Sequence, residues 1–233
     1  MRLDKFLCEL NIGSRSQVKD YIRKGLVKVN FLPAAKPEQK IDENRDKVSF
    51  QGRELHYQTF VYYMMNKPAG VVSATQDNTC RTVLDFISSD RKKDLFPVGR
   101  LDKDTEGLLL LTNDGELAHS LLSPKKHVDK TYLVGIEKPL SPKQAEALEQ
   151  GVDIGEKRLT LPAKVELLSE KLITLTIHEG KFHQVKRMLQ AVDNRVLTLK
   201  RISFGALSLD ETLPPGAYRE LTKQEVTLLY ENR

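Results

Sequence analysis

Residues 99–115 read GRLDKDTEGLLLLTNDG and constrain the fold more than any other stretch of the chain. Asp102 lies in a charged segment, and Gly107 is followed by the four leucines Leu108–Leu111 and by a polar turn at 113–115. A short apolar run bounded by turn residues is typical of a buried strand. The pattern therefore predicts a loop that holds a carboxylate rigidly at the edge of a hydrophobic core.

The chain after residue 58 alternates short strand patterns with helix patterns. The strand patterns lie at Phe60–Met65, Val71–Ser73, Leu108–Thr112, Thr131–Ile136, Val165–Leu168, Leu172–Ile177 and Val196–Leu199. The helix patterns lie at Val83–Ile87, Glu116–Leu122, 142–150 after an N-cap at Ser141, His183–Ala191 and from Thr222 onward. Because strands outnumber helices and many are joined by short turns, we expect an α+β fold with a mixed, largely antiparallel sheet flanked by helices.

The first 58 residues have the pattern of a small separate module. Ser14 and Gln17 have the spacing of a capping box, which predicts a helix that ends at Gly25. Short strands are expected at Leu26–Asn30 and Lys47–Phe50. Three basic residues recur every four positions along one face of the helix, namely Arg15, Lys19 and Arg23. A basic helix face followed by a short strand is suited to contact with an RNA backbone.

Positive charge is concentrated in this module. The chain has a net charge of +5 and a pI near 9.0. Residues 1–58 hold 12 Lys and Arg against 8 Asp and Glu, whereas residues 59–233 hold 25 against 24. A concentrated basic surface indicates a polyanionic partner, although a solvated lysine-rich surface has the same composition.

Several classes of protein do not fit this composition. No apolar stretch approaches the roughly 20 residues of a membrane span, and no apolar run near the N-terminus leads to a cleavage site. Cys8 and Cys80 are far apart and lack CxxC spacing, and the five histidines show no HxH or HExxH pattern. We therefore expect a cytoplasmic protein with free thiols, no membrane contact and no metal site.

Motifs along the whole chain resemble one enzyme family. GRLDKDTEGLLLLT at 99–112 resembles the catalytic-aspartate motif of the pseudouridine synthases of the RsuA type, which isomerise uridines in ribosomal RNA. RLDKFL and SRSQVKDYIRKGLVKVN resemble the S4 RNA-binding domain, with Asn30-Phe31 where many members have a Val-Asn-Gly turn. NKPAG at 66–70 matches a structural turn of the family. The resemblance implies an S4-like RNA-binding domain at 1–58, a catalytic domain at 59–233, and neither cofactor nor metal.

In the family motif the catalytic residue is the aspartate that follows Arg-Leu, which is Asp102 in this chain. The isomerisation breaks the N1–C1′ bond of uridine, rotates the base and forms a C5–C1′ bond. It needs a carboxylate near the anomeric carbon and a pocket for a flipped base. Asp102 suits the role of a nucleophile or of a base on the ribose, and the sequence leaves both open. Without the resemblance, Asp104 and Glu106 are rival carboxylates.

Two further motifs imply partners for Asp102. KTY at 130–132 matches the position of the family's tyrosine that stacks on the target uracil, here Tyr132. EGKFHQVKRML at 179–189 resembles the motif whose basic residue pairs with the catalytic aspartate and orients it. By position in that motif the role falls to Lys186, with Arg187 as the second choice. A solvated helix face is the alternative meaning of this charged pair.

The remaining candidate residues surround these three. Val185 is expected to pack beneath the uracil, Leu101 to contribute to the substrate site, and His183 to form structural hydrogen bonds. Arg100 is expected to stack in the gap left by the flipped base or to pair with a phosphate, with a surface ion pair as the alternative. Contacts to the RNA backbone are expected from further basic residues, namely Lys125, Lys126, Arg2, Lys5, Arg15, Lys19 and Arg23.

The sequence therefore predicts a cytoplasmic, monomeric rRNA pseudouridine synthase. KTYLV, EGKFHQVKRM and the lack of a long basic C-terminal tail resemble the enzymes of small-subunit (16S) rRNA, so this RNA is the expected partner. The alternatives are a synthase of large-subunit (23S) rRNA, a non-catalytic S4-type RNA-binding or ribosome-assembly factor, and a metal-dependent nuclease that uses the carboxylates at 102, 104 and 106.

Overall fold

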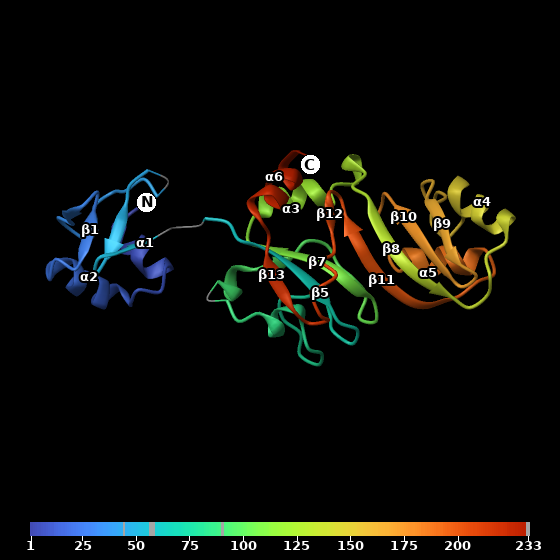
Figure 1. The fold of residues 1–233 in the computed structure, drawn as a ribbon, viewed down its shortest axis with the longest axis horizontal. Coiled ribbons are helices and arrows are strands. Elements are labelled where there is room, and N and C mark those ends of the chain that lie inside the picture. Colours follow the sequence, from blue (N-terminus) through green and yellow to red (C-terminus); the bar gives the residue numbers. More distant parts are fainter. Residues whose placement is uncertain (44, 56–58, 90, 232–233) are drawn as a thin grey trace. The chain divides into compact units, whose positions relative to one another are not determined.

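The chain folds into two compact units, Met1–Thr59 and Phe60–Arg233 (Figure 1). Each unit has its own hydrophobic core. The computed structural model describes residues 1–43, 45–55, 59–89 and 91–231. The domain boundary predicted between residues 58 and 59 adjoins residues 56–58, which lie outside the described residues.

In the first unit, two helices accompany a small antiparallel sheet with the strand order β2-β1-β3-β4. The elements are α1 (Leu3–Glu9), α2 (Arg15–Arg23), β1 (Val27–Val29), β2 (Leu32–Pro33), β3 (Val48–Phe50) and β4 (Arg53–Leu55). The predicted capping box is confirmed, because the Ser14 hydroxyl accepts a hydrogen bond from the Gln17 N–H and Ser14 N–H donates to Gln17 Oε1. The sequence analysis identified no helix before Ser14. Helix α1 forms there because its apolar residues pack into the core of the unit, namely Leu3, Phe6 and Leu7.

The second unit is built on one mixed sheet with the order β13-β5-β7-β11-β8-β10-β9, to which β6 and β12 add at β7 and β11. The strands are β5 (Tyr62–Lys67), β6 (Phe96–Pro97), β7 (Glu106–Thr112), β8 (Lys130–Ile136), β9 (Lys164–Ser169), β10 (Leu172–Ile177), β11 (Val196–Phe204), β12 (Leu207–Ser208) and β13 (Tyr218–Glu220). Strands β7 and β11 run parallel, and the other described pairs run antiparallel. The predicted α+β fold with a largely antiparallel sheet is confirmed.

Helices cover this sheet on both faces. They are η1 (Val83–Phe86), η2 (Lys92–Asp94), α3 (Gly115–Leu122), η3 (Pro124–Lys126), α4 (Pro142–Gln150), α5 (Gln184–Ala191) and α6 (Lys223–Glu231). In Figure 1, α3 and α6 lie together near β12, and α4 and α5 lie near β8–β10. Within the described residues, no helix combines the length and the apolar character that crossing a membrane would need.

The two covered faces explain the run of four leucines in β7. Leu109 and Leu111 belong to the core that contains residues of α4 and α5, whereas Leu108 and Leu110 belong to the core that contains residues of α3 and α6. Successive residues of a strand point to opposite faces, so a strand that is covered on both sides is apolar at every position. The strand predicted at Leu108–Thr112 is therefore confirmed and extends from Glu106.

The strand predicted at Val71–Ser73 is wrong. Only one bridge forms there, between Val72 and Thr82. The segment follows a turn at Gly70, whose φ is +82°, and the Ser73 hydroxyl is turned toward the backbone of Leu101 instead of following a ladder. This segment supports a neighbouring loop, which is described below.

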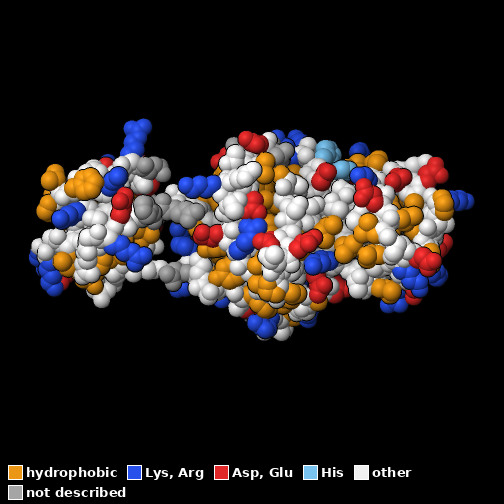
Figure 2. Space-filling view, in the orientation of Figure 1, with side chains coloured by type: hydrophobic (Ala, Val, Ile, Leu, Met, Phe, Trp, Pro, Cys, Tyr) orange, Lys and Arg blue, Asp and Glu red, His pale blue; other side chains and the backbone are white. Residues whose placement is uncertain are grey.

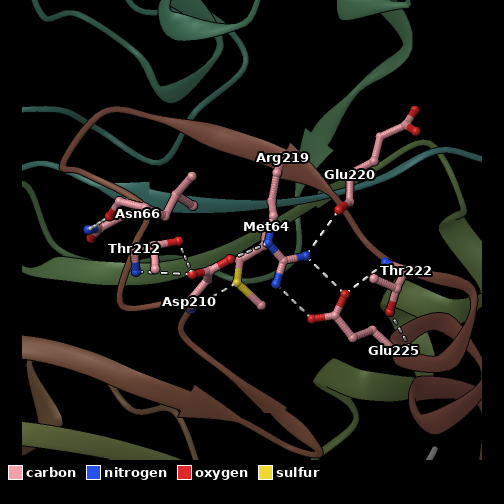
Figure 3. Close-up of polar contacts among 9 residues, drawn as sticks. Met64, Asn66, Asp210, Thr212, Arg219, Glu220, Thr222 and Glu225 are labelled. Carbon is pink, nitrogen blue, oxygen red and sulfur yellow. Dashed lines mark hydrogen bonds and ion pairs between the residues drawn. The ribbon is translucent and has the colours of Figure 1, made fainter.

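Strand β13, which the sequence did not predict, pairs with β5 at the sheet edge, and its Arg219 forms an ion-pair network (Figure 3). Arg219 Nε donates to Asp210 Oδ2 at 2.7 Å, and its two Nη atoms each donate to a carboxylate oxygen of Glu225 at 2.9 Å. Arg219 lies opposite Met64 of β5 in the strand register. The network therefore joins the β12–β13 segment to the start of helix α6.

Candidate active site

The loop between β6 and β7 presents Asp102 at the edge of the sheet. The side chain of Leu101 is buried in the core. The Ser73 hydroxyl donates to the Leu101 carbonyl at 2.9 Å and accepts from the Leu101 N–H at 3.0 Å. The N–H of Thr105 donates to the carbonyl of Asp102 at 3.1 Å. The backbone is thus held on both sides of Asp102, while 29% of the Asp102 side chain remains exposed.

A buried lysine holds the backbone of the same loop by hydrogen bonds. Lys67, at the end of β5, is fully buried. Its ammonium donates to three backbone carbonyls, those of Pro68 at 3.0 Å, Lys103 at 3.3 Å and Thr105 at 2.8 Å. Burial lowers the pKa of Lys67 to about 8, and nearby carboxylates oppose this shift. The NKPAG segment, predicted as a structural turn, therefore also fixes the path of the loop that carries Asp102.

A cation from helix α5 reaches the carboxylates of this loop. Lys186 Nζ lies 3.3 Å from Asp102 Oδ2 and 2.6 Å from Asp104 Oδ1. Burial lowers the pKa of Lys186, but hydrogen bonding and charge from these two carboxylates outweigh it, so the pKa is raised. The hydrogen bond from Lys186 also lowers the pKa of Asp104. Lys186 is therefore held in its charged form beside Asp102.

His183 lies on the other side of the Asp102 carboxylate. Its Nε2 is 3.6 Å from Asp102 Oδ1, and the residue has a left-handed φ of +49° at the N-cap of α5. The Phe182 ring stacks on the His183 ring with a centroid distance of 3.8 Å. The next residue, Gln184, is buried and donates from Nε2 to Glu179 at 2.8 Å. The turn before α5 is thus fixed by side-chain contacts and directs two basic groups toward Asp102.

These residues line a cleft of about 630 Å³. Asp102, His183 and Lys186 contribute polar groups, and Tyr132 from β8 and Val185 from α5 contribute buried apolar surface. Small-molecule pockets span about 300–1,000 Å³, so the cleft has room for a nucleotide. The cleft thus combines the Asp102 carboxylate and the adjacent Lys186 ammonium with the aromatic ring of Tyr132.

Two cations of the cleft were not predicted from the sequence. Arg201 of β11 is fully buried, lies beside Tyr132 in the strand register and donates from Nε to the Leu108 carbonyl at 2.8 Å. Its Nη2 has no hydrogen-bond partner among the described residues. Burial lowers the pKa of Arg201, and the Tyr132 hydroxyl opposes this shift. Lys130, the first residue of β8 and also in the cleft lining, has a pKa lowered to about 8 by burial.

The signals for these missed residues are present but weak. Arg201 occupies a buried position two residues after Leu199, on the buried face of an alternating strand. Lys67 ends β5, a strand that is buried at every position, where a charged residue is unusual. A charged residue at an inward strand position indicates a buried ionic contact, but the sequence does not name its partner.

Other predicted residues lie in different surroundings. Arg100 lines the cleft, is exposed, and forms no ion pair among the described residues. Arg187 does not contact Asp102, because it pairs with Glu156 at 3.0 Å and donates to the backbone carbonyls of Phe182 and Ile154. Lys125 and Lys126 are exposed in η3, directly after Ser123 and Pro124 of the cleft lining.

The five basic residues predicted in the first unit are all exposed, namely Arg2, Lys5, Arg15, Lys19 and Arg23. Three of them have acidic neighbours in ion pairs, which are Asp4 and Glu38 for Arg2, Glu9 for Lys5 and Asp20 for Arg23. In the part of the chain that the structure describes, no ion pair involves Arg15 or Lys19. Throughout the described residues of the chain, no group of three or more His, Cys, Asp and Glu side chains could hold a metal ion.

Comparison with known proteins identifies the class of protein that this fold and cleft define. The family of RNA pseudouridylate synthases matches residues 61–191, and the S4 domain matches residues 1–46. The chain belongs to the RNA pseudouridine synthase family and carries an N-terminal S4 domain. It is an isomerase that acts on RNA.

Several members of this family resemble the chain over nearly its full length. An uncharacterised RNA pseudouridine synthase of Bacillus subtilis, YtzG, is 49% identical over 236 residues and covers 99% of each chain. Ribosomal small subunit pseudouridine synthase A of Vibrio cholerae is 43% identical over 232 residues, which cover 99% of this chain and 100% of that protein. A crystal structure of a pseudouridylate synthase matches with a TM-score of 0.71 at 40% identity, and covers 98% of this chain and 99% of that chain.

Proposed function

We propose that this protein isomerises a specific uridine of small-subunit (16S) rRNA to pseudouridine, with Asp102 as the catalytic carboxylate. The observation that carries this proposal is the contact between Asp102 and Lys186 in a cleft that also contains Tyr132. An adjacent cation attracts a carboxylate and fixes its orientation. Asp102 has this partner and is still partly exposed to the cleft, so a ribose can approach it.

The residues of the cleft divide the work of the reaction. The Asp102 carboxylate acts at the ribose of the flipped nucleotide, either on C1′ as a nucleophile or as a base. The Tyr132 ring stacks on the uracil, and Val185 packs beneath the uracil. Leu101 anchors the loop beneath the substrate, and Arg100 contacts the RNA backbone or fills the gap left by the flipped base. The N1–C1′ bond breaks, the uracil rotates and the C5–C1′ bond forms. C5 then loses a proton and N1 gains one, so the product is an isomer of uridine.

The choice of small-subunit rRNA rests on relatives. Proteins of 41–43% identity over nearly the whole chain are named ribosomal small subunit pseudouridine synthase A. In this proposal, residues 1–58 bind the RNA and residues 59–233 catalyse the isomerisation. The basic residues of the first unit and of η3 contact the RNA backbone. The protein acts as a monomer in the cytoplasm and needs neither a cofactor nor a metal.

The experiment that tests this proposal is tritium release from RNA labelled at C5 of uracil, since formation of the new bond expels that hydrogen. Wild-type protein and Asp102→Asn are incubated separately with small-subunit rRNA, large-subunit rRNA and partly assembled subunits. Release from small-subunit RNA or its particle, lost in Asp102→Asn, is the expected result. Asp104→Asn is the matched control, because Asp104 shares the partner Lys186 but its side chain is 72% exposed.

Each other outcome points to a specific alternative. Tritium release only from large-subunit rRNA would show that the substrate is large-subunit rRNA and not small-subunit rRNA. RNA binding without release from any RNA or particle would favour a non-catalytic RNA-binding factor. Loss of release in the presence of EDTA would contradict the metal-free reaction.

A further inference from the structure

The hairpin between β1 and β2 has an unusual residue at its tip. Val29 pairs with Leu32, so the loop consists of two residues, Asn30 and Phe31. Their φ angles are +49° and +70°. A two-residue hairpin loop with positive φ at both positions favours Asn followed by Gly, because glycine alone adopts this conformation freely. Phe31 therefore occupies the place that suits a glycine.

Hydrogen bonds of the neighbouring Asn30 hold the turn that contains Phe31. Asn30 Nδ2 donates to Asp46 Oδ1 at 2.8 Å, and Asn30 Oδ1 accepts from the N–H of Lys47 at 3.0 Å. The N–H of Asn30 also donates to the Lys47 carbonyl at 2.8 Å. These bonds fix the turn against the segment before β3. A left-handed conformation of a bulky residue costs free energy, and such strain persists where the surroundings impose it and is concentrated at functional positions.

The strained residue gains no burial in return. The exposed fraction of Phe31 is 76%, and that of the adjacent Leu32 is 71%. The Lys47 ammonium lies 5.9 Å from the centre of the Phe31 ring. Lys28 and Lys47 are both exposed, and among the described residues neither takes part in an ion pair. Figure 2 shows hydrophobic and basic side chains side by side on the surface of this unit. The Asp46 carboxylate at the turn accepts hydrogen bonds from Asn30 Nδ2 and from the N–H of Asp42.

We propose that the Phe31 ring is a stacking platform for an unpaired RNA base, with Lys47 and Lys28 placed for the flanking phosphates. An exposed aromatic face with the Lys47 ammonium 5.9 Å from its centre suits this ligand, because every base offers a π-face and every linkage a negative charge. The unit that carries the turn is an S4 domain. The inference rests on the proposed function only in taking RNA as the ligand, and it adds a site outside the catalytic cleft.

Substitutions at Phe31 separate stacking from strain and from general apolar contact. In the full-length protein, Phe31→Gly should weaken binding to a single-stranded RNA oligonucleotide by about 5- to 100-fold, the range for loss of one base–aromatic stack. Binding to a fully paired RNA duplex should change less than about twofold, since its bases are not free to stack. Phe31→Leu keeps the apolar bulk and should lose affinity as Phe31→Gly does, whereas Phe31→Trp should keep it.

Thermal unfolding supplies a second readout. Phe31→Gly should unfold at a Tm no lower than that of the wild type, because glycine relieves the left-handed strain. A variant that is at least as stable and yet binds RNA less well cannot owe its loss to misfolding. Phe31→Leu, which keeps the strain, controls for this effect.

Several results would overturn the inference. They are wild-type affinity of Phe31→Gly or Phe31→Leu for single-stranded RNA, and an equal loss for single-stranded and duplex RNA. Undiminished RNA binding with weaker association to assembling particles would assign the turn to a protein partner and would also contradict the inference. Tritium release by the wild-type protein is measured in parallel. If it occurs while Phe31→Gly binds normally, this inference fails and the proposed function stands. If it is absent from every RNA, the proposed function fails, and the binding data still decide on stacking.

Discussion

The Lys186 ammonium lies 3.3 Å from the Asp102 carboxylate, although the two residues come from helix α5 and from the loop before β7. Both are set in place by buried neighbours. Lys186 is preceded by Val185 and followed two residues later by Met188, which anchor α5 in the core. Asp102 is preceded by the buried Leu101. The distance between cation and carboxylate is therefore fixed by packing, as a preorganised site requires.

This relationship gives the first prediction. Lys186→Met should lower kcat by about 100-fold, the order expected when a catalytic group loses its orientation. KM for RNA should change little, because Lys186 is engaged with Asp102 and Asp104 and not free for the RNA backbone. Single-turnover tritium release at saturating RNA measures the effect.

Arg187→Met is the matched control for Lys186→Met. Arg187 is the adjacent basic residue of α5, but it contacts Glu156 and backbone carbonyls instead of Asp102. Its loss should lower stability and leave kcat nearly unchanged. A kcat within about twofold of wild type in Lys186→Met, or a larger loss in Arg187→Met, would show that the wrong cation has been assigned.

The second prediction concerns the wall of the cleft. Tyr132→Ala should lower kcat/KM by about 5- to 100-fold if the ring stacks on the uracil. Tyr132→Phe keeps the ring and loses only the hydroxyl that meets Arg201, so its loss should stay within about tenfold, the value of one hydrogen bond. An equal loss of kcat/KM in the two variants would show that the Tyr132 hydroxyl, and not the ring, is needed for the reaction. Binding of RNA and tritium release are measured for both.

The sequence predicted the features that depend on residues close together in the chain. The capping boxes at Ser14 and Ser141 involve residues three apart, and both were predictable, although only the first was predicted as a complete box. The strand of four leucines was predicted from its apolar run, and the reason for the run is that helices cover both faces of the sheet. The same pattern predicted the loop before this strand, and the family motif alone singled out Asp102 from Asp104 and Glu106.

Contacts between residues far apart in the chain were not predicted from the sequence. The bonds from Lys67 to the carbonyls of the Asp102 loop span up to 38 residues, and the bond from Arg201 to Leu108 spans 93. No local pattern specifies such partners, since they depend on which strands pair. The three-residue strand β13 is too short for a periodic signal and exists because β5 offers an edge to pair with.

The third prediction tests the junction between β7 and β11. Gly107 has a φ of +101°, and a Cβ on it would lie 2.2 Å from the backbone oxygen of Arg201. Gly107→Ala should therefore destabilise the protein by about 2–4 kcal/mol, the sum of left-handed strain and overpacking. Because Arg201 must move, tritium release should fall as well. Urea unfolding monitored by circular dichroism measures the first effect.

Gly115→Ala is the comparison for Gly107→Ala within the same motif. Gly115 begins helix α3, and a Cβ there would meet no atom within 4 Å. Alanine favours the helix, so this variant should be as stable as wild type or up to about 1 kcal/mol more stable. If both glycine variants lost the same stability, the close approach of β7 to Arg201 would not be the reason for the glycine.

The last prediction concerns acid stability through the Arg219 network of Figure 3. Hydrogen bonding to Arg219 lowers the pKa of Glu225 to about 2 in the folded protein, from 4.5. A carboxyl with a depressed pKa stabilises the fold fully above pH 4.5 and loses that contribution as the pH falls toward 2. Glu225→Gln removes the charge, so it should be less stable than wild type by about 1 kcal/mol at pH 7, as expected for a partly exposed, bidentate pair. This difference should shrink steadily between pH 5 and pH 3 in urea unfolding. A difference that stayed constant over this range would mean that the side chain stabilises α6 by packing, since packing does not depend on the protonation of Glu225.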